Sequence, residues 1–519
     1  MSAEELRAAI GKRATIRLHD VDGGFRDIVG VLQSETSLIN RRGELIEFEL
    51  EKVALFRVIP VFNRRDAKAG QLSIYDTLSR EVKSVQSRDG FISIYCCGPT
   101  VYRDAHVGNL RTFLLADLIA RTLTLQGVEV QLIQNITDVG HMSEDFAEDD
   151  KILSQATLEK VSPLAIARKY EEKFHHDLAL LNIATADAYP RASETIDLMQ
   201  TMIGELISKG FAYIGDDKSV YFDAQKFFGY GEISGNKLDS LKPGHRYEYH
   251  NDGAKKFHAD WALWKAAGER SEMIWDSPWG PGFPGWHIEC SAMSMDMLDK
   301  HVDVHVGGID LRFPHHENER AQSNAVIGQE AVDVWVHGEH LLFEGKKMSK
   351  SSDNVVLVSD VIARGIDPLA LRLCFLENRY RSQMDLTWNS INAADETLKR
   401  WRNKMSTWSH SSTVSIDHEM ESAFNNDLDT PKVILRLREI EKSNLQNKHE
   451  LFSYADQVLG LDLGRPVVTR ELTAQMQTLL DERTKARSEK RWAESDALRV
   501  QLENLGLQIH DTAGGQNWS

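Results

Sequence analysis

Cysteine is scarce in this chain, with four residues among 519, at positions 96, 97, 290 and 374. So few thiols exclude a disulfide framework and favour a reducing compartment. The sequence also lacks an apolar run long enough to span a bilayer. Residues 1–7 lack the apolar centre of a signal peptide. We therefore expect a cytoplasmic protein with no membrane partner.

Positive charge is in deficit as well. The chain has 78 acidic residues against 61 lysines and arginines, a net charge of −17. This balance excludes indiscriminate binding to nucleic acid, and leaves room only for a local basic face. A hydrophobic content of 42% and a charged content of 27% are typical of a soluble globular protein. The length exceeds one ordinary core and predicts about two to four domains.

Residues 1–65 are predicted to form a unit of their own. Short stretches of alternating apolar and polar residues are separated by glycine-containing turns. The stretches are 14–18, 27–32, 37–40, 45–50 and 54–59. This pattern predicts a small five-stranded β-barrel, followed by a linker over residues 60–70. Acidic and basic residues are mixed in it, so the sequence leaves its role open.

From residue 72 the pattern changes to an alternation of strands and helices. An apolar strand at 91–95, an amphipathic helix at 110–125 and a second strand at 128–133 predict a βαβ unit. Such a unit begins an α/β fold with a Rossmann-like, doubly wound parallel sheet. We expect a domain over 72–390, with an insertion at about 145–275. Residues 395–519 are charged and predicted to be helical, as in a bundle.

Four residues spread along the chain have side chains suited to zinc: Cys97, Cys290, His315 and Glu319. His315 and Glu319 are four positions apart, so they share one face of a helix. Four ligands of these types suit a tetrahedral ion. The alternative is two buried free cysteines beside a polar helix, and the residue types alone leave both interpretations open.

Two motifs have features of a phosphate site. The segment His106-Val-Gly108-Asn109 falls where a strand ends and a helix begins, so Gly108 admits a close nucleotide and the helix N-terminus favours phosphate. Residues 347–351 read Lys-Met-Ser-Lys-Ser, and Lys347 and Lys350 can neutralise a triphosphate. Either alone is weak evidence, since it equally fits an ordinary turn or a solvated basic loop. Their ordered pairing is much more specific.

A third segment connects these features. Trp286 lies close before Cys290, and His305 opens the run His-Val-Gly-Gly-Ile-Asp310. Asp310 is placed to reach a ribose hydroxyl. Trp286 is a candidate wall of a small pocket, although a core tryptophan is the commoner explanation.

Together these motifs resemble the cysteinyl-tRNA synthetases, a class I aminoacyl-tRNA synthetase family, over residues 72–519. Residues 78–80, 135–138, 262–265, 380–383 and 492–499 extend the likeness. The resemblance implies ATP-dependent activation of L-cysteine as an adenylate and its transfer to tRNA(Cys). It also implies Zn²⁺ on the four residues above, Mg²⁺ with ATP, and a monomer.

The resemblance further assigns roles to individual residues. The implied catalytic residues are His106, Asn109, Lys347 and Lys350. The implied ATP contacts are His106, Asp310, Lys347 and Lys350. The implied cysteine pocket is formed by Thr137, Trp286 and His305. The helical region 395–519 is implied to hold the anticodon arm of tRNA. Its candidate contacts are Trp401, Arg402, Trp492, Arg499 and Trp518. For each of them, an aromatic residue packed between helices or a solvated arginine is at least as good an explanation.

The chain departs from the family pattern at three positions. Asn109 stands where a second histidine is usual, Asp353 replaces a glycine after the lysine motif, and Val306 interrupts a run of glycines. None removes a reacting group. The main alternative is the related ligase of mycothiol biosynthesis, which joins cysteine to an amino sugar through the same adenylate. Because that ligase largely lacks the C-terminal extension, the synthetase is favoured. A degenerate synthetase that only binds RNA is disfavoured by the intact motifs.

Overall fold

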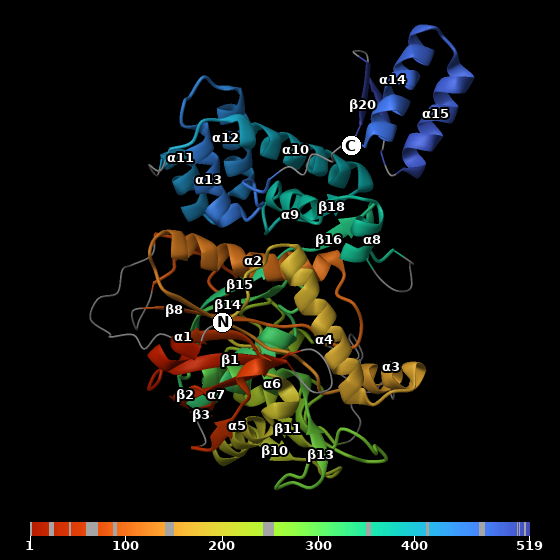
Figure 1. Ribbon diagram of the computed structural model, residues 1–519. Helices are drawn as coiled ribbons and strands as arrows, with labels where there is room; N and C mark the ends of the chain where they lie inside the picture. The colour runs from red at the N-terminus through yellow and green to blue at the C-terminus, as the bar shows by residue number, and fades with distance from the viewer. Residues whose placement is uncertain are drawn as a thin grey trace. The chain divides into compact units, whose positions relative to one another are not determined.

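The fold is that of a computed structural model. It describes residues 3–19, 25–40, 43–58, 71–86, 91–140, 150–241, 254–348, 354–411, 415–466, 473–505, 507, 509–512 and 515–518. The chain divides into two compact units, Met1–Leu463 and Gly464–Ser519 (Figure 1).

The N-terminal residues form a five-stranded antiparallel sheet in the order β4-β3-β2-β1-β5. Its strands are β1 (Arg13–His19), β2 (Phe25–Ser34), β3 (Ser37–Ile39), β4 (Leu45–Glu47) and β5 (Val53–Val58). A short helix, α1 (Ala3–Ala8), contributes Leu6 to the core of this sheet and was not predicted. Among the described residues β4 and β5 are the two edges of the sheet, so closure into a barrel stays a prediction. The predicted linker at 60–70 lies outside the described residues.

The central sheet is parallel, as predicted, with the order β15-β14-β8-β9. It comprises β8 (Ile92–Cys96), β9 (Val130–Gln134), β14 (Val302–Gly308) and β15 (Val332–Gly338). Helix α2 (Val107–Leu125) covers one face, and α6 (Trp286–Met297) and α7 (His315–Ile327) cover the other (Figure 1). Alternation along β8 sends Ile94 and Cys96 to the α2 side, whereas Tyr95 and Cys97 belong to the core of the α6–α7 side.

The insertion is helical at first and then forms strands. Its helices are α3 (Lys151–Glu159), α4 (Pro163–Leu180) and α5 (Ile196–Ser208). An antiparallel sheet follows, made of β10 (Ala212–Ile214), β11 (Val220–Phe222), β12 (Trp261–Ala266) and β13 (Gly282–Pro284). This sheet returns the chain to α6 at residue 286.

Shorter elements follow the central sheet. A hairpin of β6 (Ser73–Asp76) and β7 (Glu81–Ser84) contacts β15, and β16 (Leu341–Phe343) pairs with both β17 (Lys346–Lys347) and β18 (Met384–Leu386). The helices that follow are α8 (Val358–Ala363), α9 (Leu369–Leu376), α10 (Trp388–Thr407), α11 (His418–Asn425), α12 (Thr430–Lys442) and α13 (Lys448–Leu459). In the described ranges, no helix combines the length and apolar character needed to cross a membrane.

The second unit is a helical hairpin with a β-ribbon. It comprises α14 (Ala474–Ser488), α15 (Trp492–Asn504), β19 (Ile509–Thr512) and β20 (Gly515–Trp518). Met476, Leu480, Leu502 and Leu507 form its small core.

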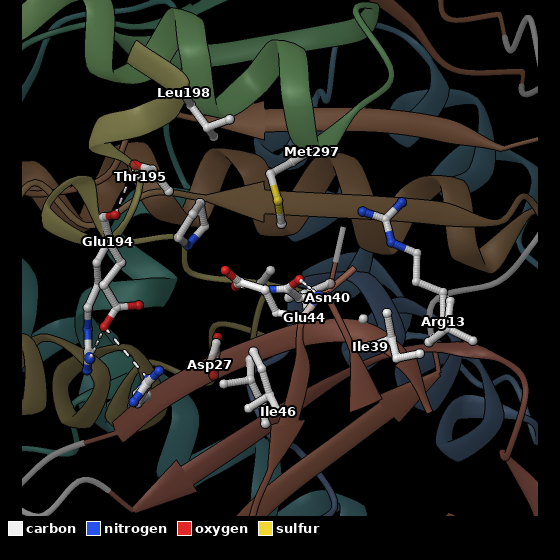
Figure 2. A pocket seen from close by; sticks show the side chains of 18 residues that line it. Arg13, Asp27, Ile39, Asn40, Glu44, Ile46, Glu194, Thr195, Leu198 and Met297 are labelled. Carbon is white, nitrogen blue, oxygen red and sulfur yellow. Dashed lines mark hydrogen bonds and ion pairs between the residues drawn. The ribbon is translucent and has the colours of Figure 1, made fainter. Parts of the chain in front are cut away.

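A buried ion pair within the N-terminal sheet, Arg17–Asp27, contacts Tyr189 of the segment 185–195. Arg17 donates two hydrogen bonds to Asp27, of 2.8 and 2.9 Å, and lies 4.6 Å over the ring of Tyr189. The Tyr189 amide also donates to Asp27, at 3.0 Å from Oδ2, the oxygen that accepts from Arg17 Nη2. Beside this seam lies a cavity of about 690 Å³, where Leu198 and Met297 face Ile39 and Ile46 (Figure 2).

Candidate metal centre and nucleotide cleft

The four predicted metal ligands converge behind the carboxyl end of β8. Their ligand atoms all lie within 4.8 Å of one another, and all four residues are buried. The Cys97 and Cys290 sulfurs are 3.8 Å apart, and Glu319 Oε1 lies 3.4 Å from Cys97 Sγ and 2.9 Å from His315 Nε2. Cys97 follows β8, Cys290 lies on α6, and the other two lie one turn apart on α7. This buried cluster can hold a metal ion.

A second set of ligands shares half of the first. His305 and His316 each place Nε2 3.4 Å from Cys97 Sγ, and with Glu319 they form another group within 4.8 Å. His305, predicted for the cysteine pocket, therefore borders the metal cluster and is 1% exposed. Sequence reasoning did not single out His316, because a residue next to a candidate ligand on a polar helix has no distinctive spacing of its own.

Burial controls the protonation of the cluster. It raises the pKa of the Cys97 thiol and of the Glu319 carboxyl, because an apolar interior destabilises the charged form of each group. Burial also lowers the pKa of His305 and His316, which are therefore neutral imidazoles. The hydrogen bond from Cys97 lowers the pKa of Cys290. Glu319 Oε2 is buried and accepts no hydrogen bond from the described residues. A cation bound among these side chains would neutralise this carboxylate oxygen.

Several predicted residues meet in one cleft of about 240 Å³ at the carboxyl end of the sheet. Cys97, Asn109, Trp286 and Asp310 all line it. Trp286 begins α6 and stacks on His315, with ring centroids 4.2 Å apart. The cleft thus brings together one residue from each predicted group: a metal ligand, a catalytic residue, a cysteine-pocket residue and an ATP contact.

His106 acts as the N-cap of α2. Its Nδ1 accepts a hydrogen bond from the Asn109 amide at 3.2 Å, so the ring proton is on Nε2. Burial, with the nearby Arg103 charge, lowers the pKa of His106 and keeps the ring neutral. Neutral His106 is therefore a hydrogen-bond donor at a helix N-terminus, where phosphate charge is favoured.

The start of the lysine motif (residues 347–351) lies next to the histidine motif (residues 106–109). A Cβ at Gly108 would lie 2.8 Å from Met348 Cε, and the Val107 amide donates to the Val356 carbonyl at 3.0 Å. Lys347 is exposed on β17. Lys350 and Asp353 lie outside the described residues. The segments on either side of the motif are thus fixed next to α2.

Thr137 lies at the end of β9 in a braced loop. It is 2% exposed, and its hydroxyl accepts a hydrogen bond from Asn135 Nδ2 at 3.1 Å. The next residue, Asp138, accepts hydrogen bonds from the Ser193 amide and hydroxyl, at 2.8 and 2.6 Å, and pairs with Arg168 at 3.0 Å. Segment 185–195, on which the N-terminal sheet rests, therefore also supports the loop of Thr137.

Two candidate tRNA contacts turn out to be packing residues. Trp401 is 0% exposed and donates its indole N–H to Glu441 at 3.1 Å. Arg402 pairs with Asp367 at 2.6 Å and donates to the Leu461 and Asp462 carbonyls. A buried ring, and a guanidinium that donates from all three of its nitrogens to neighbouring groups, leave no surface for RNA, so the packing interpretation holds for both residues. In contrast, Trp492 is 56% exposed.

Family models match two parts of the chain. The class I (C) tRNA synthetase catalytic domain matches residues 83–396, and the cysteinyl-tRNA ligase anticodon binding domain matches residues 469–518. Residues 1–82 lie outside both. The match at the C-terminus disfavours the amino-sugar ligase alternative, which was predicted to lack such an extension.

Full-length relatives agree with these matches. The chain is 39% identical over 486 residues to a cysteine–tRNA ligase of Synechococcus elongatus, covering 86% of this chain and 99% of the relative. It is 37% identical to that of Thermus thermophilus, with the same coverage, and 40% identical to cysteine–tRNA ligase 1 of Burkholderia lata, covering 86% and 96%. The chain belongs to the cysteine–tRNA ligase family of class I aminoacyl-tRNA synthetases.

Proposed function

We propose that the protein activates L-cysteine with ATP and transfers it to tRNA(Cys), and that it selects cysteine through a zinc ion held by Cys97, Cys290, His315 and Glu319. The observation that carries this proposal is the buried ligand cluster opening through Cys97 into the cleft lined by Asn109 and Asp310.

The residues present fit zinc. Two sulfurs bound at about 2.3 Å in a tetrahedron are about 3.8 Å apart, and the Cys97–Cys290 separation is 3.8 Å. Cys97 and Cys290 make this set a better match than the set with His305 and His316, because zinc favours thiolate ligands. Zinc bound there would lower the pKa of the substrate thiol and prefer its sulfur to the hydroxyl of serine.

The residues of the chain would perform the rest by position and charge. His106 donates from Nε2 to a phosphate oxygen at the start of α2, while Lys347 and Lys350 neutralise the triphosphate and the departing pyrophosphate. The Asp310 carboxylate accepts a hydrogen bond from a ribose hydroxyl of ATP. Thr137 and Trp286, with His305, shape the space for cysteine beside the cluster. The cysteine carboxylate then attacks the α-phosphorus and releases pyrophosphate. A ribose hydroxyl of tRNA next attacks the adenylate carbonyl and releases AMP.

The helical region 395–519 would hold the anticodon arm, with Trp492 as its exposed aromatic and Arg499 close by on α15. Mg²⁺ would accompany ATP. We propose that the protein acts as a monomer in the cytoplasm.

Two assays with purified protein test this function. We expect pyrophosphate exchange that depends on L-cysteine, and charging of tRNA(Cys) with labelled cysteine. Exchange without charging of tRNA would favour transfer to another acceptor. Absence of cysteine-dependent exchange would refute the activation step itself.

A further inference from the structure

A second pocket, with an excess of positive charge, lies next to the cleft. It has a volume of about 230 Å³ and lies at the carboxyl ends of β14 and β15. Its charged lining residues are Arg80, Arg312, Arg381 and Glu339. The remaining lining residues are Tyr75, Thr77, Ile233, Ile309 and His337. In a chain with a net charge of −17, three guanidinium groups around one small space point to an anion.

Only one of the three arginines has a counter-charge. Arg381 donates to Asp427 at 2.8 and 2.6 Å and lies 4.3 Å over the Tyr75 ring. Arg80 and Arg312 form no ion pair with any residue in the described ranges. The single lining carboxylate, Glu339, accepts the His340 amide at 2.9 Å. Two of the guanidinium groups that line the pocket, those of Arg80 and Arg312, thus have no counter-charge within the described part of the chain.

Arg80 is held in a conformation that few side chains adopt. Its φ of 62° is in the left-handed region, within the turn between β6 and β7. The turn is fixed by Asp76, which accepts the Leu78 and Ser79 amides at 3.2 and 3.0 Å. A Cβ at Gly235 would lie 3.1 Å from Arg80 Nη2, so the guanidinium lies close to the insertion.

The pocket and the cleft are the two sides of one loop. Gly308, Asp310 and Leu311 line the cleft, whereas Ile309 and Arg312 line the pocket. An anion in the pocket would therefore lie one loop away from the place where the adenylate forms. During transfer, the acceptor strand of tRNA must bring its terminal ribose to that place.

We infer that this pocket binds a backbone phosphate of the tRNA acceptor strand through Arg80 and Arg312, and so positions the 3′ end for transfer. The inference rests on the proposed function. Paired guanidinium groups match the geometry of phosphate oxygens, which makes arginine the usual residue for such a contact. Phosphates of ATP or pyrophosphate have the same chemistry, and the test must separate these sources.

The test compares charging with cysteine-dependent pyrophosphate exchange, which needs no tRNA, in the full-length protein. Arg312→Gln and Arg80→Gln are the test variants. Lys300→Gln is the control, because Lys300 is exposed and precedes β14, at the opposite end of the strand from the pocket. We expect each test variant to lower kcat/KM for tRNA about tenfold, with exchange within about twofold of the parent. The dependence of tRNA affinity on log salt should also become shallower by about one unit per arginine.

Three outcomes would overturn the inference. They are unchanged charging, a fall in exchange equal to the fall in charging, and an equal loss of charging in the Lys300→Gln control. The second would assign the pocket to ATP or pyrophosphate. If the parent protein forms the adenylate but never charges tRNA, the proposed function fails first, and that failure is visible before any variant is compared.

Discussion

The Arg17–Asp27 ion pair is predicted to stabilise the N-terminal sheet against local opening. Both side chains are nearly buried, with exposures of 9% and 5%. Asp27→Asn leaves the Arg17 cation buried without its partner, and the loss of one member of a buried pair costs about 3 kcal/mol. A local opening that is easier by that amount occurs about 150-fold more often. Replacing both members, as Arg17→Met with Asp27→Leu, removes the charge problem and should cost less than about 1 kcal/mol.

Hydrogen exchange measured residue by residue is the assay. We expect the Ile16 and Ile28 amides of β1 and β2 to lose about two orders of magnitude of protection in Asp27→Asn. The control is Glu49→Gln, since Glu49 pairs with Lys52 at a site where it is 68% exposed and the pair contributes little. A loss below threefold in Asp27→Asn, or equal losses in the single and double variants, would refute this account of the seam.

Three further predictions follow from the site and the helical region. Cys290→Ala should lower zinc affinity by at least about tenfold while His316→Asn retains stoichiometric zinc, measured by metal analysis after dialysis; the reverse result would favour the second ligand set. Burial raises the pKa of Cys97 and Glu319, so these groups hold protons at neutral pH that zinc must displace. Zinc binding to the metal-free protein should therefore release protons, and its affinity should weaken as the pH falls. Calorimetry in buffers of different ionisation enthalpy would measure this proton release. Trp401→Leu should destabilise the protein by about 3 kcal/mol in thermal unfolding without a change in KM for tRNA at low temperature, whereas Trp492→Ala should raise that KM and leave stability within about 0.5 kcal/mol.

Local periodicity was enough to predict the framework. The strand pattern around residues 91–95 and 128–133 corresponds to β8 and β9, and the alternation in residues 14–59 corresponds to the five strands of the N-terminal sheet. Both predictions succeed because the pattern of apolar and polar residues along a strand reflects which of its faces are buried. The short helix α1 escaped, since six residues carry too little pattern.

Side-chain chemistry was enough to single out the four residues of the buried cluster as candidate ligands, although it left a second interpretation open and could not bring them together. Cys97 reaches α6 and α7 because it follows Tyr95 by two positions on the same face of the sheet, a fact of register rather than of spacing. His316 was not predicted, because its place in the second ligand set depends on how α7 is oriented toward Cys97. The sequence left Trp401 ambiguous, because an aromatic residue on a charged helix has the same sequence signal whether it faces a core or an RNA.

The arginine pocket illustrates contacts that no local pattern encodes. Arg80 comes from a hairpin turn, Arg312 from the loop after β14 and Arg381 from the segment before β18. Arg80 and Arg381 fall in segments that extend the family likeness, but no spacing in the sequence connects them with each other or with Arg312. Only the folding of three distant segments around one space makes them a set.

X-ray absorption at the zinc edge, on zinc-loaded protein, tests the central claim most directly. We predict two sulfur neighbours at about 2.3 Å in the free protein and a third when L-cysteine is added, with no change on adding L-serine. A sulfur count that stays the same with cysteine, or a protein that activates cysteine fully after its metal has been removed, would contradict selection of the substrate through a metal–sulfur bond.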